Sequence, residues 1–439
     1  MKIKLSLFLV IVMLSIQGRS QTKWSLEDCI NYALTNNIQV KRQMLQADLS
    51  KNNFVQSKLN VLPNLNAGIN RTYSFGRYFD PKANSIFENN STTDSYSVNA
   101  DIALFAGLQN YNNIKMNEFS MLAKLQDVEK EKIQLTLNIA SAYLDILFKK
   151  ELLQVSKSQL GITDLQVDRT KKLVNAGSLA KGDLLVIQAQ LASEKLNVTN
   201  AQNDLKLSYL NLTQFLDLDS VGGFEIAFQD TISTNFISPI SSEMDVYYKA
   251  LEFLPQIKSA EYQLKSYEKG LDIQKGKLSP VLYANGSYGT GYSSNLTGKN
   301  YSDQLNLNKN QTVGVGLSVP IFNKWQVENG ISNAKVQVND AEYQLYQLKQ
   351  QLYKEIQQAH NNAVSSREKY NSAIEAVNSL KESFNYTEQK FNVGLVNSVE
   401  YNIAKNNYIK AESDLLQAKY QYIFSVKILD FYKGIPISL

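Results

Sequence analysis

The sequence predicts a mainly α-helical protein built from two tandem repeats, with a β part that crosses a membrane. Three observations predict this fold class: an internal repeat with a constant offset, proline-led segments of alternating polarity, and two helices of unusual length. Of the 439 residues, only 20 are glycine and 7 are proline, a composition that suits long helices better than a loop-rich globule. The chain is long enough for two or three ordinary domains or for one elongated protein.

The internal repeat is clearest at two glycine turns. Residues 174–177 read Val-Asn-Ala-Gly and residues 391–394 read Phe-Asn-Val-Gly, so the two turns are 217 residues apart. An acidic residue follows each glycine by six positions, at Asp183 and Glu400. The same shift aligns Pro63 with Pro280, Phe105 with Phe322 and Leu135 with Leu352. One register without insertions indicates that a whole structural unit was duplicated.

The repeat predicts the domain organisation. We expect a signal peptide over 1–20, a first repeat over 21–220, a linker with an equatorial strand over 221–240, and a second repeat over 241–439. The first repeat should contain short helices, a strand hairpin over 64–105, a long helix over 108–173, a tip turn over 174–181 and a return helix over 182–217. The second repeat should contain short helices, a hairpin over 281–322, a long helix over 325–390, a tip turn over 391–398 and a return helix over 399–432.

The first twenty residues have the pattern of a secretory signal peptide. Lys2 and Lys4 precede the apolar run 5–16, and Gly18-Arg19-Ser20 offers a cleavage site of small residues. The run is shorter than the ~20 apolar residues of a transmembrane helix, and no later stretch approaches that length without charges. If this protein spans a membrane, it must therefore do so with strands.

Charge and reactive residues exclude several classes of function. The net charge is +4, but the predicted signal peptide holds three basic residues, which leaves 42 basic against 41 acidic residues and no indication of nucleic acid binding. Cys29 is the only cysteine, so no intrachain disulfide forms, and we expect it to be a small core residue. His360 is the only histidine, so the serines lack a catalytic partner. We expect no enzyme activity, no cofactor and no metal.

Two stretches in the first repeat alternate in polarity as half-buried strands do. Over 64–76 the odd positions are apolar apart from Arg71, and a polar loop over 80–94 separates this stretch from a second alternation over 95–105. The second repeat alternates regularly over 312–321, and its partner segment over 281–292 is rich in glycine and tyrosine. Each repeat therefore predicts a two-stranded hairpin with one apolar and one hydrated face.

The hairpins allow two interpretations. They can form a half-buried sheet in a soluble domain, or part of a transmembrane barrel whose strands carry apolar side chains outside and polar ones inside. The signal peptide and the alternation favour the barrel, but four strands cannot close one, since single-chain barrels need about eight. Subunits must therefore share the wall. Aromatic residues suited to the two membrane interfaces are Tyr73, Phe75, Tyr288 and Tyr292 on one side and Phe105, Phe322 and Trp325 on the other.

A very long helix follows each hairpin. Residues 108–173 contain no proline and a single glycine, and at about 1.5 Å per residue they would extend about 100 Å. Apolar residues recur every seven positions along this stretch, along the return segment and along both counterparts in the second repeat. Such a repeat predicts left-handed coiled packing of the outgoing and returning helices. Between the repeats, we expect the short strand over 224–228 to pack outside these helices.

These features, in this order, resemble the TolC family of outer-membrane efflux and secretion channels. The resemblance covers nearly the whole mature chain, and it includes the Asn-x-Gly turns Asn175–Gly177 and Asn392–Gly394. It implies a homotrimer with a twelve-stranded β-barrel, four strands from each subunit, continued by a long α-helical coiled-coil tunnel in the periplasm. The implied location is the outer membrane.

The resemblance also implies roles for particular residues. The tip turns, with Asn175, Gly177, Asn392 and Gly394, would dock a periplasmic adaptor. Asp183 and Glu400 match family acids that ring the tunnel mouth and select for cations or gate it. These two acids also have a simpler interpretation, since acids in the first turn of a helix favour its dipole by ~0.3–1 kcal/mol.

The chain departs from the family pattern at three positions near the predicted mouth. A second family acid falls on Ile403, and the tyrosine and arginine that brace the closed mouth fall on Phe391 and Asn397. The family's gating mechanism therefore does not carry over intact.

The predicted function is a passive exit duct of a tripartite efflux or type I secretion system. It would conduct small molecules or exported substrates to the exterior from a periplasmic adaptor (membrane fusion) protein and an inner-membrane pump of the proton-driven or ATP-driven type. The other expected partners are further copies of the chain and outer-membrane lipid, without nucleic acid. The alternative is a secreted or periplasmic coiled-coil structural or interaction protein without a pore.

Overall fold

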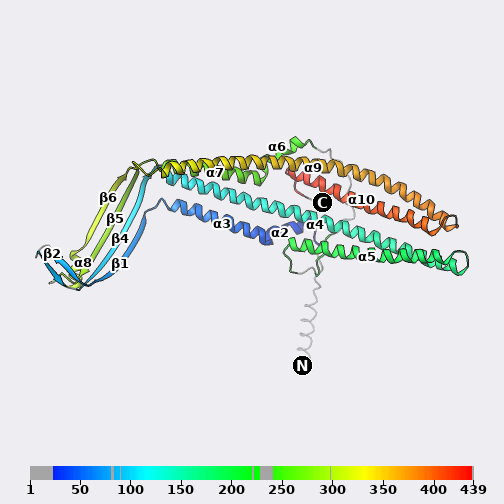
Figure 1. Ribbon diagram of the computed structural model, residues 1–439, viewed down its shortest axis with the longest axis horizontal. Coiled ribbons are helices and arrows are strands. Elements are labelled where there is room, and N and C mark those ends of the chain that lie inside the picture. Colours follow the sequence, from blue (N-terminus) through cyan, green and yellow to red (C-terminus); the bar gives the residue numbers. More distant parts are fainter. Residues whose placement is uncertain are drawn as a thin grey trace, which may run out of the picture. The chain divides into compact units, whose positions relative to one another are not determined.

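The computed structural model describes residues 23–80, 84–88, 90–219, 222–227, 241–296 and 298–437. The predicted signal peptide and most of the predicted linker lie outside these residues. The chain forms two compact units, each drawn from both halves of the sequence: residues 1–44, 127–255 and 348–439 make one, and residues 45–126 and 256–347 make the other. The second unit contains the β-sheet, and the first contains the ends of the long helices that meet the glycine turns (Figure 1).

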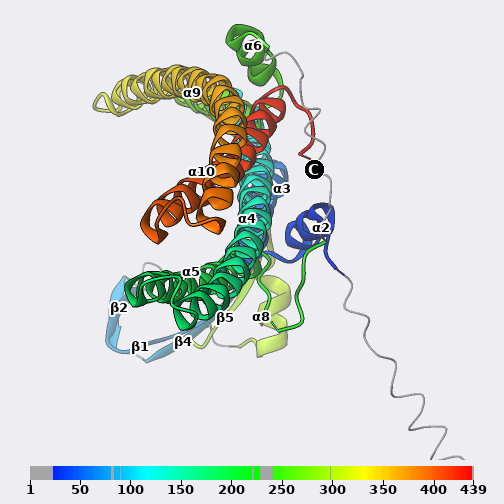
Figure 2. The ribbon, with the colours of Figure 1, turned by 90° about the vertical axis from the view of Figure 1, so that its right-hand side faces the viewer.

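The boundaries of four helices in the first repeat and four in the second are related by the 217-residue shift. Helices α2 (Leu26–Asn36) and α6 (Glu243–Phe253) have 11 residues each, and α3 (Ile38–Leu59) and α7 (Pro255–Gly276) have 22 each. The long helices α4 (Gln109–Asn175) and α9 (Gln326–Asn392) have 67 residues each, and the return helices α5 (Lys181–Phe215) and α10 (Ser398–Tyr432) have 35 each. In these four pairs, every first and last residue of one helix therefore has its counterpart in the other. Helix α5 lies beside α4, and α10 beside α9 (Figure 2).

Short polar side chains set the helix boundaries near the start of the described chain. Ser25 caps α2, because its hydroxyl accepts a hydrogen bond from the Asp28 amide at 3.1 Å while the Asp28 carboxylate accepts one from the Ser25 amide at 3.0 Å. Asn37 then separates α2 from α3, and its side-chain oxygen accepts from the amides of Gln39 and Val40. Serine and asparagine are favoured at these positions because their side-chain oxygens satisfy the free amides at the start of a helix.

The sheet has four antiparallel strands in the order β1 (Asn64–Ser74), β4 (Ser91–Ala106), β5 (Val281–Ser293) and β6 (Asn310–Ser318). The pairing register creates rows of apolar side chains that cross all four strands, such as Leu65–Ala100–Gly286–Val313. The rows between them are polar, such as Asn66–Asn99–Ser287–Thr312. Because neighbouring positions on a strand face opposite sides, one face of the sheet is apolar and the other is polar.

The connections of the sheet hold more structure than the alternation predicts. A short hairpin of β2 (Arg77–Asp80) and β3 (Ser85–Glu88) begins before the expected polar loop over 80–94 and extends into it. Strand β4 begins at Ser91, before the predicted start at Ser95. Helix α8 (Tyr301–Leu307) lies between β5 and β6. Strand β6 ends at Ser318, because Pro320 follows and cannot donate to a strand ladder.

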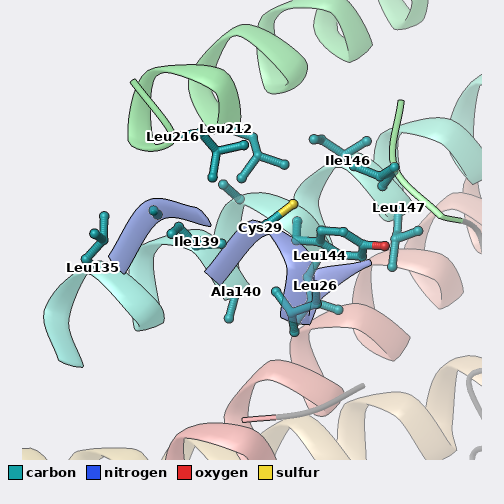
Figure 3. Packing of buried hydrophobic residues seen from close by; sticks show 14 of the residues in the cluster. Leu26, Cys29, Leu135, Ile139, Ala140, Leu144, Ile146, Leu147, Leu212 and Leu216 are labelled. Carbon is teal, nitrogen blue, oxygen red and sulfur yellow. The ribbon is translucent and has the colours of Figure 1, made fainter. Parts of the chain in front are cut away.

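The largest apolar core of the helical unit surrounds α2. Cys29 is fully buried there, as predicted, together with Ile139 of α4 and Leu212 of α5 (Figure 3). The Tyr143 hydroxyl, also in this core, donates to the Ala227 carbonyl at 2.6 Å and so ties α4 to the segment that follows the first repeat. That segment, predicted as a strand over 224–228, forms only a single bridge between Ile226 and Trp24 in its described part.

The core around α2 predicts a large effect for one substitution. Ile139→Ala should lower the free energy of unfolding by about 2–5 kcal/mol, because it leaves a cavity among fully buried side chains. Leu165→Ala is the matched control on the same helix, and since Leu165 is 73% exposed, its change should stay within about 0.5 kcal/mol. Urea unfolding in detergent, followed by far-ultraviolet circular dichroism, measures both. Equal effects of the two substitutions would contradict the assignment of the core.

Candidate functional site

The two glycine turns have the same backbone geometry. Gly177 and Gly394 adopt left-handed φ angles of 76° and 79°. In the first turn, the Ser178 amide donates to the Leu173 carbonyl at 2.9 Å and the Gly177 amide donates to the Val174 carbonyl at 3.0 Å. In the second turn, the amides of Leu395 and Gly394 bond to Lys390 and Phe391 in the same pattern. Both turns are therefore Schellman motifs, in which glycine ends the outgoing helix without steric cost.

The tip residues singled out by the sequence are open to solvent. Asn175, Gly177, Asn392 and Gly394 are all exposed. Asn392 also binds Arg169 of α4, whose guanidinium donates to the Asn392 side-chain oxygen at 2.5 Å. This contact joins the turn of the second repeat to a helix of the first.

The two predicted mouth acids have different surroundings, although they occupy equivalent positions. Glu400 is exposed, and its amide donates to Asn397, the N-cap of α10, at 2.9 Å. Asp183 is half-buried and accepts a hydrogen bond from Ser398 of α10 at 2.7 Å. Ala180, the counterpart of Asn397, makes no side-chain cap for α5. Both acids lie in a helix first turn, and only Asp183 is part of a contact between the repeats.

The three positions that depart from the family pattern have different surroundings in the structure. Phe391 is buried and stacks on Tyr401 with ring centroids 4.8 Å apart, in a cluster that also contains Phe384 and Ile187. Burial raises the pKa of Tyr401 to about 12. Asn397 serves as the N-cap, and Ile403 is 56% exposed. An apolar cluster therefore occupies the place where the resemblance implies a polar brace.

A buried polar cluster that the sequence pattern did not predict lies about one helical turn beyond Tyr401 on α10. The Lys405 ammonium lies 3.0 Å from the Glu194 carboxylate and also donates to the hydroxyl of Thr163, which in turn donates to Glu194. All three side chains are at least 95% buried. Lys405 comes from α10, Glu194 from α5 and Thr163 from α4, so the cluster joins three helices of both repeats.

Burial dominates the electrostatics of this cluster. Desolvation lowers the pKa of Lys405 below its ordinary value, and the attraction of Glu194 offsets this only in part. The net effect of placing this charge inside the bundle is therefore unfavourable, as is common for buried ion pairs. A sequence signal existed, because Lys405 lies between the heptad positions Tyr401 and Tyr408, where an apolar residue is expected.

Further polar contacts line the same seam between the first repeat and α10. Gln190 donates to Asn406 at 3.0 Å, and Gln159 donates to Glu412 at 3.4 Å. Farther from the tip, Glu151 of α4 accepts from the Tyr420 hydroxyl at 2.6 Å. The buried atoms Gln166 Nε2, Thr170 Oγ1 and Tyr401 OH have no hydrogen-bond partner among the residues that the structure describes. We call the contacts between the first repeat and α10 the polar seam: Glu194–Lys405, Gln190–Asn406, Gln159–Glu412, Glu151–Tyr420 and Asp183–Ser398.

The predicted interface aromatics lie toward the two ends of the sheet. Tyr73 pairs with Thr92 and Tyr292 pairs with Asp94 at one end, whereas Phe105 pairs with Leu282 at the other. Tyr288 lies four residues before Tyr292 on β5, near the middle of the strand. Phe75, Phe322 and Trp325 follow strand ends and are at least 72% exposed. Tyr292 is partly covered by Tyr301 of α8, with ring centroids 4.7 Å apart.

The described part of the chain holds no group of three or more side chains suited to a metal ion. None of its helices combines the length and the apolar character needed to cross a membrane.

A family model described as outer membrane efflux protein matches residues 29–217 and 246–434. The chain belongs to the outer membrane efflux protein family. The two matched ranges are related by the same 217-residue shift as the helices, so each repeat carries one copy of the family unit.

The most similar relatives support this membership. The outer membrane protein TolC of Escherichia coli (strain K12) is 26% identical over 339 residues, which cover 74% of this chain and 65% of the relative. The match therefore spans less than two thirds of that protein. Among solved structures, CusC superposes with a TM-score of 0.82 at 17% identity over 94% of this chain and 92% of its own. The CmeC outer membrane channel of Campylobacter jejuni gives 0.82 at 16% identity over 94% and 87%.

These comparisons confirm the family, the fold class and the location expected from the sequence. The chain is a tandem-repeat protein of the TolC family and an outer-membrane protein, and its family is one of outer membrane efflux proteins rather than enzymes.

Two alanine substitutions near the first glycine turn should have opposite effects on stability. Gly177→Ala should destabilise the tip by about 1–2 kcal/mol, because alanine is strained at a left-handed φ. Gly182→Ala, in the first turn of α5 with no atom near the added Cβ, should stabilise the protein by about 0.4–1 kcal/mol, because alanine lowers the conformational entropy of the unfolded chain. Hydrogen exchange of amides 172–178, followed by mass spectrometry, should rise in the first variant only. Faster exchange in both variants would contradict the assigned role of Gly177.

The buried cluster predicts non-additive effects. Lys405→Met should lower the free energy of unfolding by about 3–5 kcal/mol, because Glu194 then keeps a buried charge without its partner. Adding Glu194→Leu should restore most of the loss, which a double-mutant cycle of urea unfolding measures. Lys132→Met removes an exposed pair with Glu129 and should change stability by less than about 1 kcal/mol. A double variant as unstable as Lys405→Met would contradict this account.

Proposed function

We propose that the chain is the passive exit duct of a tripartite efflux or type I secretion system. Substrate would pass from an inner-membrane pump, through a periplasmic adaptor, into a channel of this protein and out of the cell. The observation that carries the proposal is the two-faced sheet, whose register gathers apolar side chains on one face and polar side chains on the other. A wall of this kind can face lipid on one side and water on the other.

The open edges of the sheet support a homotrimer. Strands β1 and β6 each have only one partner among the described strands. An unpaired edge is costly in lipid, because no water satisfies its amide and carbonyl groups. Pairing β6 of one copy with β1 of the next removes every edge once the ring closes. Three copies supply twelve strands, enough to enclose a water-filled lumen.

The tip turns are the proposed docking surface for the adaptor. Val393 and Leu395, which flank Gly394, are 71% and 74% exposed. Their counterparts in the first turn, Ala176 and Ser178, are smaller or polar. The second turn therefore offers an apolar contact, together with exposed Asn392, that the first turn does not. Exposed apolar side chains of this kind are characteristic of protein interaction sites.

Asp183 and Glu400 are the proposed acids of the periplasmic aperture. Glu400 is exposed and so free to meet passing ions, whereas Asp183 is occupied by Ser398. We therefore assign the larger share of cation selection to Glu400 and a structural share to Asp183. The motive force belongs to the pump, whether proton-driven or ATP-driven.

Planar-bilayer recording of the purified protein tests the duct. The reconstituted protein should conduct ions with a preference for cations, which a reversal potential under a salt gradient measures. Insertion without conductance would contradict the proposed function.

Selectivity tests the two acids separately. Glu400→Gln should lower the cation-to-anion permeability ratio by a factor of about two to five, because a charge at the mouth acts on ions within a screening length of about 10 Å at 0.1 M salt. Asp183→Asn should lower the ratio less, because Asp183 is half-buried and bonded to Ser398. Asp245→Asn on α6 removes the same charge from an exposed position away from the tip and should leave the ratio unchanged. An effect of Asp245→Asn equal to that of Glu400→Gln would exclude a special role for the tip acids.

A further inference from the structure

Helix α8 packs on the apolar face of the sheet and not on the polar face. Asp94 and Tyr96 of β4 lie on the same face as Val98, because their positions differ by multiples of two. The Tyr301 hydroxyl of α8 donates to the Asp94 carboxylate at 3.1 Å and lies 2.6 Å from the Tyr96 hydroxyl. The side of the sheet that carries the apolar rows therefore also carries α8, at one end of the strands.

A cluster of four polar side chains holds α8 in this place. Arg71 of β1 donates from two nitrogens to the two carboxylate oxygens of Asp94, each at 2.6 Å. Tyr301 and Tyr96 complete the cluster, and Asp94 is 2% exposed beneath them. A buried carboxylate is stable only when such partners satisfy it. We call Arg71, Asp94, Tyr96 and Tyr301 the α8 clasp.

Hydrogen bonds between side chains and the main chain also hold the same helix on β5. The Thr290 hydroxyl donates to the Leu305 carbonyl at 2.5 Å, and Asn308 donates to the Gly291 carbonyl at 2.7 Å. Gln304 is buried, and its side-chain oxygen accepts from the Ser293 amide at 2.9 Å. Helix α8 is therefore a fixed part of the sheet surface.

The position of the clasp matches the edge of a membrane-spanning band. Tyr96 and Phe105 are nine positions apart on β4, which corresponds to about 30 Å along a strand. At the usual strand tilt of about 40°, this becomes a height of about 23 Å, close to the apolar band of about 25 Å on membrane barrels. Phe105 thus marks one boundary of the band, and Tyr96, with α8 above it, marks the other.

The outer surface of α8 has the mixed character of an interfacial element. Leu307 of α8 is exposed, as is Leu296 before the helix in the sequence. Lys299 and Lys309 flank the helix in the sequence, while Asp303 is its one acid. Long basic side chains place their methylene groups against apolar surroundings and their charge in water. Tyrosine is enriched at the same depth of membranes.

We propose that α8 lies on the lipid side of the outer-membrane sheet, in the headgroup layer of the outer leaflet, and that the α8 clasp holds it there. The partner is the phosphate-bearing headgroup region of the membrane. Continuity with the apolar face and the flanking lysines favour this partner over the aqueous lumen, which would adjoin the opposite face. The proposal rests on the proposed membrane insertion of the sheet and is independent of conductance.

Depth-dependent fluorescence quenching tests the proposal. Leu307→Cys on α8 and Val315→Cys on the apolar face of β6 are each labelled with a fluorophore in a Cys29→Ala background. The full-length protein is reconstituted into phosphatidylcholine vesicles that carry a nitroxide either on the headgroup or midway along the acyl chain. The Leu307 label should be quenched at least about twofold more by the headgroup nitroxide, and the Val315 label more by the acyl-chain nitroxide.

The two labels separate the possible failures. A Leu307 label that responds to aqueous iodide and to neither nitroxide, while the Val315 label responds to the acyl-chain nitroxide, would overturn the proposal and leave membrane insertion intact. If neither label responds to lipid nitroxides, the proposed insertion of the sheet fails, and this inference fails with it.

Tyr301→Phe tests the clasp. This variant removes the hydroxyl that binds Asp94 and Tyr96 but keeps the aromatic ring. Headgroup quenching of the Leu307 label should fall by about half as α8 loosens, and quenching of the Val315 label should stay constant. Tyr288→Phe is the control, an exposed tyrosine on the same face, and should change neither label. Unchanged quenching at Leu307 in Tyr301→Phe would exclude the clasp as the anchor of α8.

Discussion

The antiparallel register of the four strands is the constraint on which the rest of the structure depends. Side chains alternate between the two faces with a period of two, so a slip of one residue between any two strands would move a set of apolar side chains to the polar face. The observed register avoids this across Leu65, Ala100, Gly286 and Val313. The pair of β4 and β5 is critical, because it joins the two repeats, and there a bulge between Ala103 and Phe105 adjusts the register at one end.

The helical unit solves a different problem, the alignment of long helices that could slide past one another. Heptad packing alone is degenerate, since a shift of seven residues restores the same apolar stripe. Lys405 and Glu194 remove this degeneracy, because any other alignment leaves two buried charges apart. The other contacts of the polar seam, from Glu151 to Ser398, fix the alignment of the helices in the same way. Its polar contacts distinguish one alignment from the alternatives, and they add less stability than apolar residues of the same size.

The two repeats have kept their backbone and changed their side chains where the chain turns at the tip. All four pairs of helices share their boundaries under one shift, and both glycines make the same motif. Yet Asn397 caps one return helix while Ala180 leaves the other without a side-chain cap. Asp183 contacts the opposite repeat, and Glu400 does not. Duplication thus supplied the scaffold, and divergence made the two tips chemically distinct.

The sequence by itself determined the features that depend on local periodicity. The 217-residue repeat, the long helices, the Ser25 cap, the glycine turns and the two-faced strands all follow from the pattern of neighbouring residues. The overall family followed from the order of these features. The position of Cys29 in the core was also predictable, because the apolar face of an amphipathic helix packs against the core and Cys29 lies among the apolar positions of that helix.

Only the tertiary structure decided which distant side chains meet. Lys405 reaches Glu194 across 211 positions and Ser398 reaches Asp183 across 215, and such contacts depend on how far one helix is rotated and shifted along another. The same holds for α8, which lies in a segment without alternation and is fixed by Asp94 across 207 positions. Local sequence sets the period of each element. The pairing of elements sets which charges are buried together, because burial is a property of the assembled surface.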